Sequence, residues 1–135
     1  MPRPHFLEPA LDARGRWGLR LDGSDTWLAT DAELAGTSAA RRRGLAGRES
    51  MPAGSALVIA PSQGIHTFGM RFAIDLVAVD RRGVVVAVMR DVPPRRLRFA
   101  WRAFAMVELP AGTAAARQVR CGDRLVATAN RMVPR

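Results

Sequence analysis

Lysine is missing from this 135-residue chain, and cysteine occurs only once, as Cys121. Because a single cysteine cannot form an internal disulfide, we expect the protein to reside in a reducing cytoplasm. The N-terminal residues contain no apolar signal core, and no apolar run approaches the ~20 residues of a membrane-spanning helix. We therefore expect neither secretion nor a membrane partner.

Complete motifs for catalysis, metal binding or cofactor binding are also missing. Metal sites usually use three or more ligands, whereas this chain has two histidines and no H-x-H or C-x-x-C spacing. The G-x-S-x-G turn of hydrolases and the glycine-rich loops that bind nucleotides do not occur either. We expect no metal ion and no cofactor, and the sequence favours a non-catalytic role.

The net charge of +9 comes entirely from arginine. Arginine suits carboxylate, phosphate and aromatic partners, so a functional basic surface is one interpretation. The other is compositional, because an arginine-only, alanine-rich chain is also typical of GC-rich coding. Composition alone favours the second interpretation.

The length suits one domain with one core. Residues 1–15 carry Pro2, Pro4 and Pro9, which predicts an irregular N-terminal segment. Residues 16–130 are then expected to form a single β domain.

The stretch from Gly64 to Met89 holds the densest run of β-branched and aromatic residues. Two apolar runs, Leu76–Val79 and Val84–Val88, flank the turn Asp80–Gly83, which predicts a β-hairpin. The preceding residues, Ile65–Met70, are expected to add a further strand to the same sheet. Because both hairpin strands are apolar at consecutive positions, we expect them to be central or buried on two faces. The predicted core residues are Leu76, Val77, Val79, Val84, Val86, Val88, Val107 and Leu109.

One helix is predicted near residues 31–43. Thr30 and Glu33 fit a capping box, and Gly44 is a natural stop. Arg41–Arg43 would then lie at the negative end of the helix dipole, either as a solvated helix end or as an anion site.

Short strands are expected on both sides of this helix and of the hairpin. The two prolines of Arg90–Arg102 predict a long surface loop. Gly83, Gly112 and Gly122 end strands and are expected to take positive φ. Seven or eight strands with one short helix indicate a mostly β fold, a sandwich or barrel. The remaining predicted strands are 16–21, 26–29, 56–60, 103–109 and 124–129, with one helical turn possible in 114–120.

Four segments occur in an order and spacing that resemble a known family. They are GLAGR (44–48), IHTFGMRFAIDLVAVDRRGVVVAV (65–88), VELPAG (107–112) and CGDRL (121–125). Together they are similar to the domain-of-unknown-function family 192, a widespread prokaryotic family, over about residues 27–128. The resemblance implies a single jelly-roll-like β domain with a small helix in a bacterial protein, and it implies no established activity.

The polar residues of the central stretch are the first candidates for a site. In an extended strand, alternation puts His66 on the apolar side with Phe68 and Met70. That position predicts a core or rim histidine, and the alternative is a histidine that lines a pocket. Arg71 and Asp75 are expected to pair with each other as a structural salt bridge. The candidate ligand-binding residues are His66, Thr67, Met70, Arg71 and Asp75.

Two further features carry chemistry. Glu108 is expected to point inward from its strand, which would require a partner such as an arginine. The loop after Pro94 interleaves arginine with Phe99 and Trp101, a composition found in platforms for single-stranded nucleic acids. No named nucleic-acid module accompanies it. The candidate anion-binding residues are Arg95, Arg96, Arg98 and Arg102.

Three functions remain open from the sequence. The first is a non-catalytic domain that binds a small molecule or peptide near His66–Arg71. The second is a hydrolase-like enzyme that uses His66 with Asp75 or Glu108. The third is a nucleic-acid or anion binder that acts through Arg95–Arg102, with weak and non-specific binding expected for nucleic acid. The catalytic residues, the ligand and the oligomeric state are not indicated by the sequence.

Overall fold

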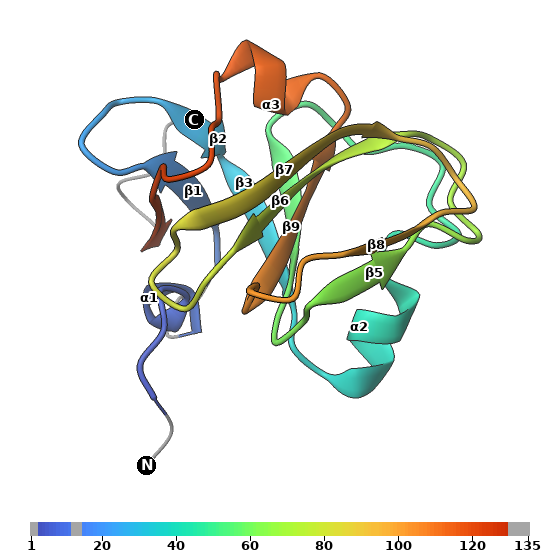
Figure 1. The fold of residues 1–135 in the computed structure, drawn as a ribbon, viewed down its shortest axis with the longest axis horizontal. Coiled ribbons are helices and arrows are strands. Elements are labelled where there is room, and N and C mark those ends of the chain that lie inside the picture. The colour runs from blue at the N-terminus through green and yellow to red at the C-terminus, as the bar shows by residue number, and fades with distance from the viewer. Residues whose placement is uncertain (1–2, 12–14, 130–135) are drawn as a thin grey trace.

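The computed structural model describes residues 3–11 and 15–129 (Figure 1). These residues form ten strands in three sheets and three short helices, and the strands do not close into a barrel. In chain order the elements are α1 (Glu8–Leu11), β1 (Trp17–Leu21), β2 (Trp27–Ala29), β3 (Asp31–Ala35), α2 (Ser38–Arg43), β4 (Ser55–Ile59), β5 (Gly64–His66), β6 (Ile74–Val79), β7 (Val85–Val92), β8 (Leu97–Phe99), β9 (Ala105–Pro110), α3 (Thr113–Ala116) and β10 (Leu125–Ala129).

A five-stranded sheet with the order β3-β4-β9-β6-β7 forms the centre of the molecule. All neighbours in it are antiparallel except β3 and β4, which run parallel. Every residue of β6 is buried, and β9 is buried from Ala105 to Leu109. Because alternate side chains point to opposite faces, this sheet supplies apolar residues to two separate cores.

The first core lies between the five-stranded sheet and a three-stranded sheet, β10-β1-β2. Val58, Val77 and Val107 point into it from the central strands, and Leu19 and Leu125 face them. Two sheets packed over a shared apolar layer make a β-sandwich. The expectation of a mostly β, sandwich-type fold is confirmed.

The second core covers the opposite face of the five-stranded sheet. Leu57, Leu76 and Met106 point toward it, and Leu45 and Ile65 close it from the connecting segments. The segments on this side include α2 and the small two-stranded sheet β5-β8, which lie close together in Figure 1. This layer forms the walls of a pocket together with the five-stranded sheet.

Several local predictions are confirmed. The strands β6 and β7 form the predicted antiparallel hairpin. Gly83, Gly112 and Gly122 all take positive φ, at 85°, 94° and 93°.

The core prediction holds for β6 and β9 and is weaker for β7. The predicted core residues of β6 and β9 are all buried. Val84, Val86 and Val88 are only half-buried. The reason is topological, since β7 is an edge strand of the five-stranded sheet and not a central one.

The helix predicted near residues 31–43 is wrong in its first half. Residues Asp31–Ala35 form β3, which pairs in parallel with β4, and the helix begins only at Ser38. Its N-cap is Thr37, whose hydroxyl accepts a hydrogen bond from the Ala40 amide at 3.1 Å. Pairing with β4 outweighs the local capping pattern at Thr30, because strand pairing and burial decide weak propensities.

Two predictions about the central stretch also need correction. The strand before the hairpin ends at His66, and it joins β8 in a separate two-stranded sheet instead of extending the hairpin sheet. The segment 90–102 is not one loop, because β7 continues to Val92 and Leu97–Phe99 forms β8. Pro93 and Pro94 lie between these strands, where no ladder amide is needed.

The N-terminal segment contains a helical turn, α1, and Leu7 beside it is buried in the first core. The rest of the segment expected to be irregular lies partly outside the described residues, at 1–2 and 12–14. The expected end of the domain at 130 lies outside them as well.

Candidate functional site

A pocket of about 660 Å³ lies where the five-stranded sheet, α2 and β5-β8 meet. We call it the Glu108 pocket, after the acidic residue that lines it. A volume of this size fits a small organic molecule. Its lining residues are Ser38, Arg41, Arg42, Arg43, Gly44, Ile59, Pro61, Ser62, Gln63, Gly64, Ile65, His66, Leu97, Phe99 and Glu108.

Glu108 lies in the middle strand of the central sheet. Alternation along β9 directs it to the same face as Met106, toward the second core. Its direct neighbours in the sheet are Leu57 on β4 and Leu76 on β6, and both are buried. The residue as a whole is 1% exposed, so its carboxyl group is removed from bulk water. The expectation that Glu108 points inward is confirmed.

The partner expected for Glu108 is not there. Its Oε2 atom is buried and has no hydrogen-bond partner among the described residues. The charge of Arg48 acts on Glu108, but the Arg48 guanidinium group donates two hydrogen bonds to the Glu33 carboxylate, each at 3.1 Å. Most buried polar atoms in folded proteins are hydrogen-bonded, and an unpaired one costs about 1–3 kcal/mol.

Burial raises the pKa of Glu108 from 4.5 to about 8, against a smaller lowering by the positive charge of Arg48. Removal from water disfavours the charged form of a carboxyl group. At neutral pH the group is therefore mostly protonated, and its O–H is a hydrogen-bond donor in the pocket wall. Strongly shifted carboxyl groups in pockets are characteristic of functional sites.

The end of α2 passes directly over this carboxyl group. A Cβ atom at Gly44 would lie 3.8 Å from Oε1 and 3.9 Å from Oε2 of Glu108. Gly44 caps the helix with φ of 50° and ψ of −128°, a conformation that favours glycine. The glycine that ends the helix thus also brings the backbone close to the buried acid.

His66 is exposed and lines the Glu108 pocket. Of the two positions predicted for it, core or rim, the core position is therefore wrong. Its Nε2 lies 3.1 Å from the backbone oxygen of Arg42. A carbonyl can only accept, so Nε2 carries the proton and the neutral ring keeps Nδ1 as an acceptor. The ring also packs near Phe68, with 6.0 Å between centroids. The alternation argument failed because β5 ends at His66.

Thr67 and Met70, predicted as ligand-binding residues, are both buried. The Thr67 hydroxyl donates to the Pro93 oxygen at 2.7 Å and accepts from the Arg96 amide at 2.9 Å. It therefore fixes the end of β5 to the chain before β8. Met70 packs in the second core, and neither side chain lines the Glu108 pocket.

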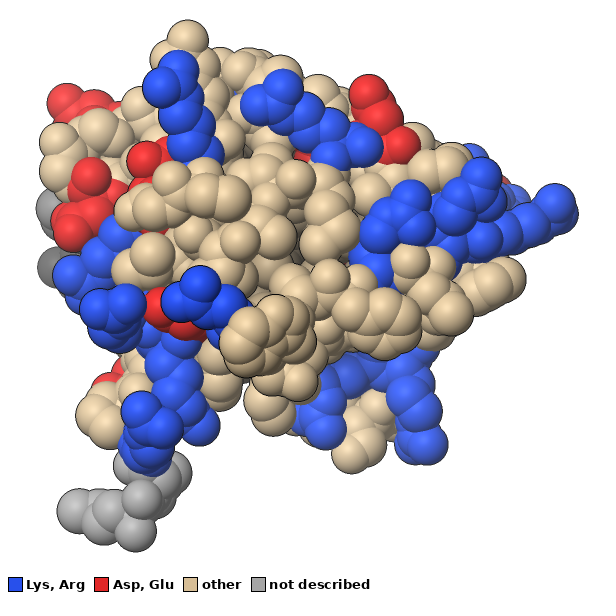
Figure 2. Space-filling view, in the orientation of Figure 1, with Lys and Arg blue, Asp and Glu red and all other residues tan. Residues whose placement is uncertain are grey.

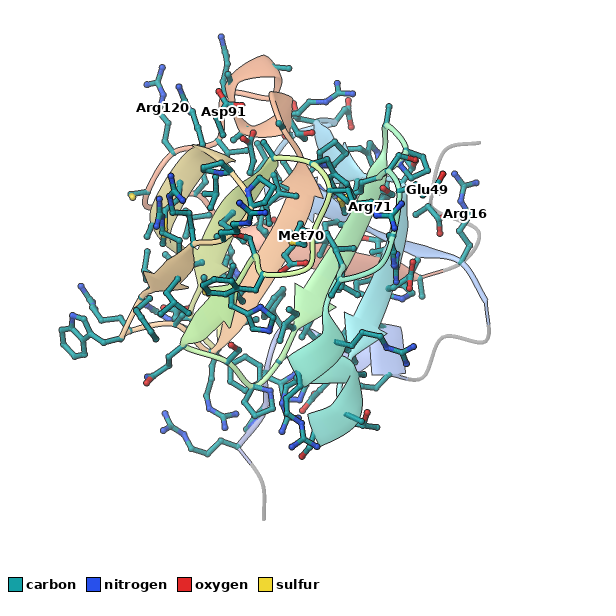
Figure 3. All side chains as sticks on the ribbon, turned by 90° about the vertical axis from the view of Figure 1, so that its right-hand side faces the viewer. Arg16, Glu49, Met70, Arg71, Asp91 and Arg120 are labelled. Carbon is teal, nitrogen blue, oxygen red and sulfur yellow. The ribbon has the colours of Figure 1, made fainter. Side chains whose placement is uncertain are left out.

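The predicted pair between Arg71 and Asp75 does not form. Arg71 is exposed and lies 3.6 Å from Glu49, and the two side chains are neighbours in Figure 3. The pair fails because Arg71 belongs to the irregular segment before β6, whereas Asp75 is inside that strand and is buried.

Asp75 has a structural environment. Its Oδ1 accepts a hydrogen bond from the Asp91 amide at 3.0 Å. Its Oδ2 accepts from the amides of Gly112 and Ala114, at 3.0 and 2.9 Å. These bonds hold the beginning of α3 and the end of β7 to β6. The structure thus brings His66 and Glu108 into one pocket and leaves Asp75 out of it.

The arginines predicted to bind anions surround β8. Arg96 and Arg98 donate to backbone oxygens of their own segment, with the Arg98 bond to Leu97 at 2.9 Å. Arg95 and Arg102 are exposed, as are Phe99 and Trp101, at 71% and 79%. Figure 2 shows arginines spread over much of the visible face, with fewer acidic residues between them. None of these four arginines lines the Glu108 pocket.

Other residues of the pocket were not predicted as ligand contacts from the sequence. Leu97 and Phe99 on β8 and Ile59 on β4 supply its apolar wall. These residues come together because β5 pairs with β8. Each of these strands has three residues, which is too short for the sequence to indicate the pairing. The arginine triplet at the end of α2, noted as a possible anion site, does line the pocket.

A metal-type cluster and a membrane-spanning helix are both absent from the described residues. No three histidine, cysteine, aspartate or glutamate side chains lie together as a metal site would require. No helix in residues 3–11 and 15–129 is long and apolar enough to cross a membrane. The free cysteine, Cys121, is exposed in a turn away from the pocket.

Comparison with known proteins finds two solved structures with a similar fold and one family that matches the sequence. A protein of unknown function from Novosphingobium aromaticivorans aligns with a TM-score of 0.68 and 19% identity, over 80% of this chain and 82% of its own. A protein from Sinorhizobium meliloti, described as "a putative transcription regulator", aligns with a TM-score of 0.75 and 18% identity, over 94% of this chain and 98% of its own. At such identities the likeness shows the fold alone. No curated protein matches the chain. The sequence itself matches the family described as "Uncharacterized ACR" over residues 19–127. The chain therefore belongs to this family, the domain-of-unknown-function family 192.

Proposed function

We propose that the protein is a binding module for a small organic molecule, which occupies the Glu108 pocket. The observation that carries the proposal is the buried Oε2 of Glu108, which has no hydrogen-bond partner in the described part of the chain and belongs to a residue that lines a cavity of about 660 Å³. An unpaired polar atom at such a position is a cost to stability that a bound ligand would remove. The Glu108 O–H would donate to an acceptor atom of that ligand.

The remaining surface of the pocket supports the same function. Apolar side chains of Ile59, Leu97 and Phe99 offer contact to the body of a ligand. His66 offers a ring nitrogen as an acceptor. A site with mostly apolar walls and a few polar groups is typical of small-molecule binding.

The experiment is a fragment titration followed by backbone amide shifts in nuclear magnetic resonance. We expect small aromatic probes to shift the amides of Gly44, Gly64 and His66. Phe99→Ala should weaken this binding, whereas the matched control Trp101→Ala should not, because only Phe99 lines the pocket although both rings are exposed. A panel that shifts none of these amides, or equal effects of both variants, would contradict the proposal.

Acid–base catalysis in the same pocket is the second candidate function. It is favoured by one specific observation, that the Glu108 carboxyl group, whose pKa burial raises to about 8, and the His66 imidazole line one cavity. Turnover of a panel of small esters would test it. Loss of turnover in both His66→Ala and Glu108→Gln would support catalysis, and turnover that persists in both variants would reject it.

A further inference from the structure

The charges that line the Glu108 pocket are strongly unbalanced. Arg41, Arg42 and Arg43 line it from the end of α2. Arg41 is half-buried and donates to the Gly36 oxygen at 2.6 Å, which fixes its guanidinium group. Arg42 and Arg43 are exposed and make no ion pair with any carboxylate in the described part of the chain. Two cations at the pocket rim are therefore available to a ligand.

Glu108 does not offset these cations at neutral pH. Within the lining of the pocket it is the one carboxyl group, and it is mostly protonated because its pKa is about 8. The other charged groups near it are Arg48 and its partner Glu33, on the far side of Gly44. Its neighbours on β4 and β6 are leucines. The pocket therefore combines a cationic rim with an uncharged donor at its wall.

The arrangement defines the chemical class of the ligand. We infer, on the basis of the proposed function, that the Glu108 pocket takes an amphipathic organic anion. Its anionic head lies against Arg42 and Arg43, and its apolar body lies along Leu97 and Phe99. Arginine pairs well with planar, bidentate acceptors such as carboxylates, and it also pairs with phosphate-type groups. Glu108 donates its proton to a hydrogen bond with a polar atom of the ligand.

Binding of an anion in this pocket should depend on pH. Above about pH 8 Glu108 ionises and places a negative charge beside the anion. His66 also lines the pocket. The arginines stay charged throughout. Ionisation of Glu108 should therefore weaken anion binding above about pH 8, whereas the attraction of the arginines persists at all these pH values.

Calorimetric titration of the full chain with three matched probes tests the inference. The probes are 4-phenylbutyrate, the uncharged 4-phenylbutyramide and 3-phenylpropylphosphonate. At pH 6.5 we expect the carboxylate to bind about tenfold more tightly than the amide, as for a ligand that gains one charge-assisted contact. Between pH 6.5 and 9 the ratio of the affinity for the carboxylate to the affinity for the amide should decrease severalfold. In Glu108→Gln the advantage should stay constant across that range, because the amide side chain does not ionise.

The double variant Arg42→Gln/Arg43→Gln should lower the affinity for the carboxylate about tenfold and leave the amide unchanged. The matched control is Arg117→Gln/Arg120→Gln, which removes the same charge at exposed positions outside the pocket. It should have little effect, because salt screens distant charges. Equal binding of carboxylate and amide, or equal loss in both double variants, would overturn the anion inference but leave the small-molecule site standing. Absence of binding by all three probes and by the fragment panel would overturn both.

A preference between carboxylate and phosphonate distinguishes the two sources of an anionic head. Tighter binding of the carboxylate supports an organic acid as the natural ligand. Tighter binding of the phosphonate supports a phosphorylated compound, and both results uphold an organic anion.

Discussion

The buried carboxyl group of Glu108 should make the stability of the protein depend on pH in one direction. In the folded state its pKa is about 8, whereas its ordinary value is 4.5. Below pH 4.5 both folded and unfolded states hold the proton. Between these two values the folded state binds more protons than the unfolded state, so the free energy of unfolding falls as pH rises. Above about pH 8 the group is ionised in both states, and the loss is complete.

The size of the loss follows from the interval between the two pKa values. One pH unit corresponds to ~1.4 kcal/mol for a single group. From 4.5 to about 8, the loss is on the order of 4–5 kcal/mol. This is a large share of the ~5–15 kcal/mol by which domains of this kind are stable. It corresponds to a decrease of roughly 15 °C in Tm for a chain of this length.

Glu108→Gln isolates this contribution. The amide has the shape of the protonated acid and does not titrate, so all other groups contribute equally to both proteins. We expect the variant to match the wild type near pH 4.5 and to become more stable than it by on the order of 4 kcal/mol at pH 9. Urea unfolding at half-unit intervals from pH 4.5 to 9 measures the difference directly.

Glu49→Gln is the matched control, because Glu49 is an exposed glutamate whose one ion pair in the described chain is the contact with Arg71. The free energy of unfolding of this variant should differ from that of the wild type by a small and nearly constant amount at every pH, because exposed ion pairs contribute little to stability. If the curves of wild type and Glu108→Gln run parallel across the whole range, the folded-state pKa is ordinary and the argument from burial is wrong.

Four further outcomes follow from the structure. Asp75→Asn should lower the free energy of unfolding by about 2–4 kcal/mol at neutral pH, measured by urea unfolding, because three backbone amides that donate to Asp75 lose their carboxylate acceptor. A loss below ~0.5 kcal/mol would contradict this account. Gly83→Ala should lower the free energy of unfolding clearly more than Gly112→Ala. Both glycines have positive φ, but a Cβ atom at Gly83 would clash with the Leu125 oxygen, whereas one at Gly112 would have no atom within 4 Å. Equal losses would argue against the close approach at Gly83. His66→Ala should change the free energy of unfolding by less than ~1 kcal/mol at both pH 5 and pH 8, because the ring is exposed. A loss of several degrees in Tm would indicate instead that the ring is packed in the core. Binding of any oligonucleotide should be weak and fall steeply with salt, so tight binding at physiological salt that is lost in Trp101→Ala would favour the nucleic-acid function.

The parts of the fold that the sequence predicts are those decided by local chemistry. The hairpin β6-β7 follows from two apolar runs around a short turn, and the three glycines at positive φ follow from their places at strand ends. Residues 31–35 show the limit of such reasoning. Their capping pattern favours a helix, yet parallel pairing with β4 makes them a strand. The partner strand begins at Ser55, about twenty residues further along the chain, and no local pattern indicates that pairing.

The site is harder to predict for the same reason. His66 and Glu108 are each visible in the sequence as polar residues in apolar surroundings. Their presence in one pocket depends on β5 leaving the hairpin sheet to pair with β8. That rearrangement brings Leu97 and Phe99 over the pocket and places the ring of His66 against the end of α2.

Two buried acids on neighbouring strands show what separates a structural residue from a candidate site residue here. In sequence Asp75 and Glu108 are equivalent, since each interrupts an apolar strand and each is buried. Asp75 accepts three backbone hydrogen bonds, so its charge is compensated within the fold. Glu108 lines a cavity and has an oxygen without a hydrogen-bond partner among residues 3–11 and 15–129, so this polar group is open to a ligand. Burial alone therefore does not mark the site; the hydrogen bonds that the fold leaves unmade do.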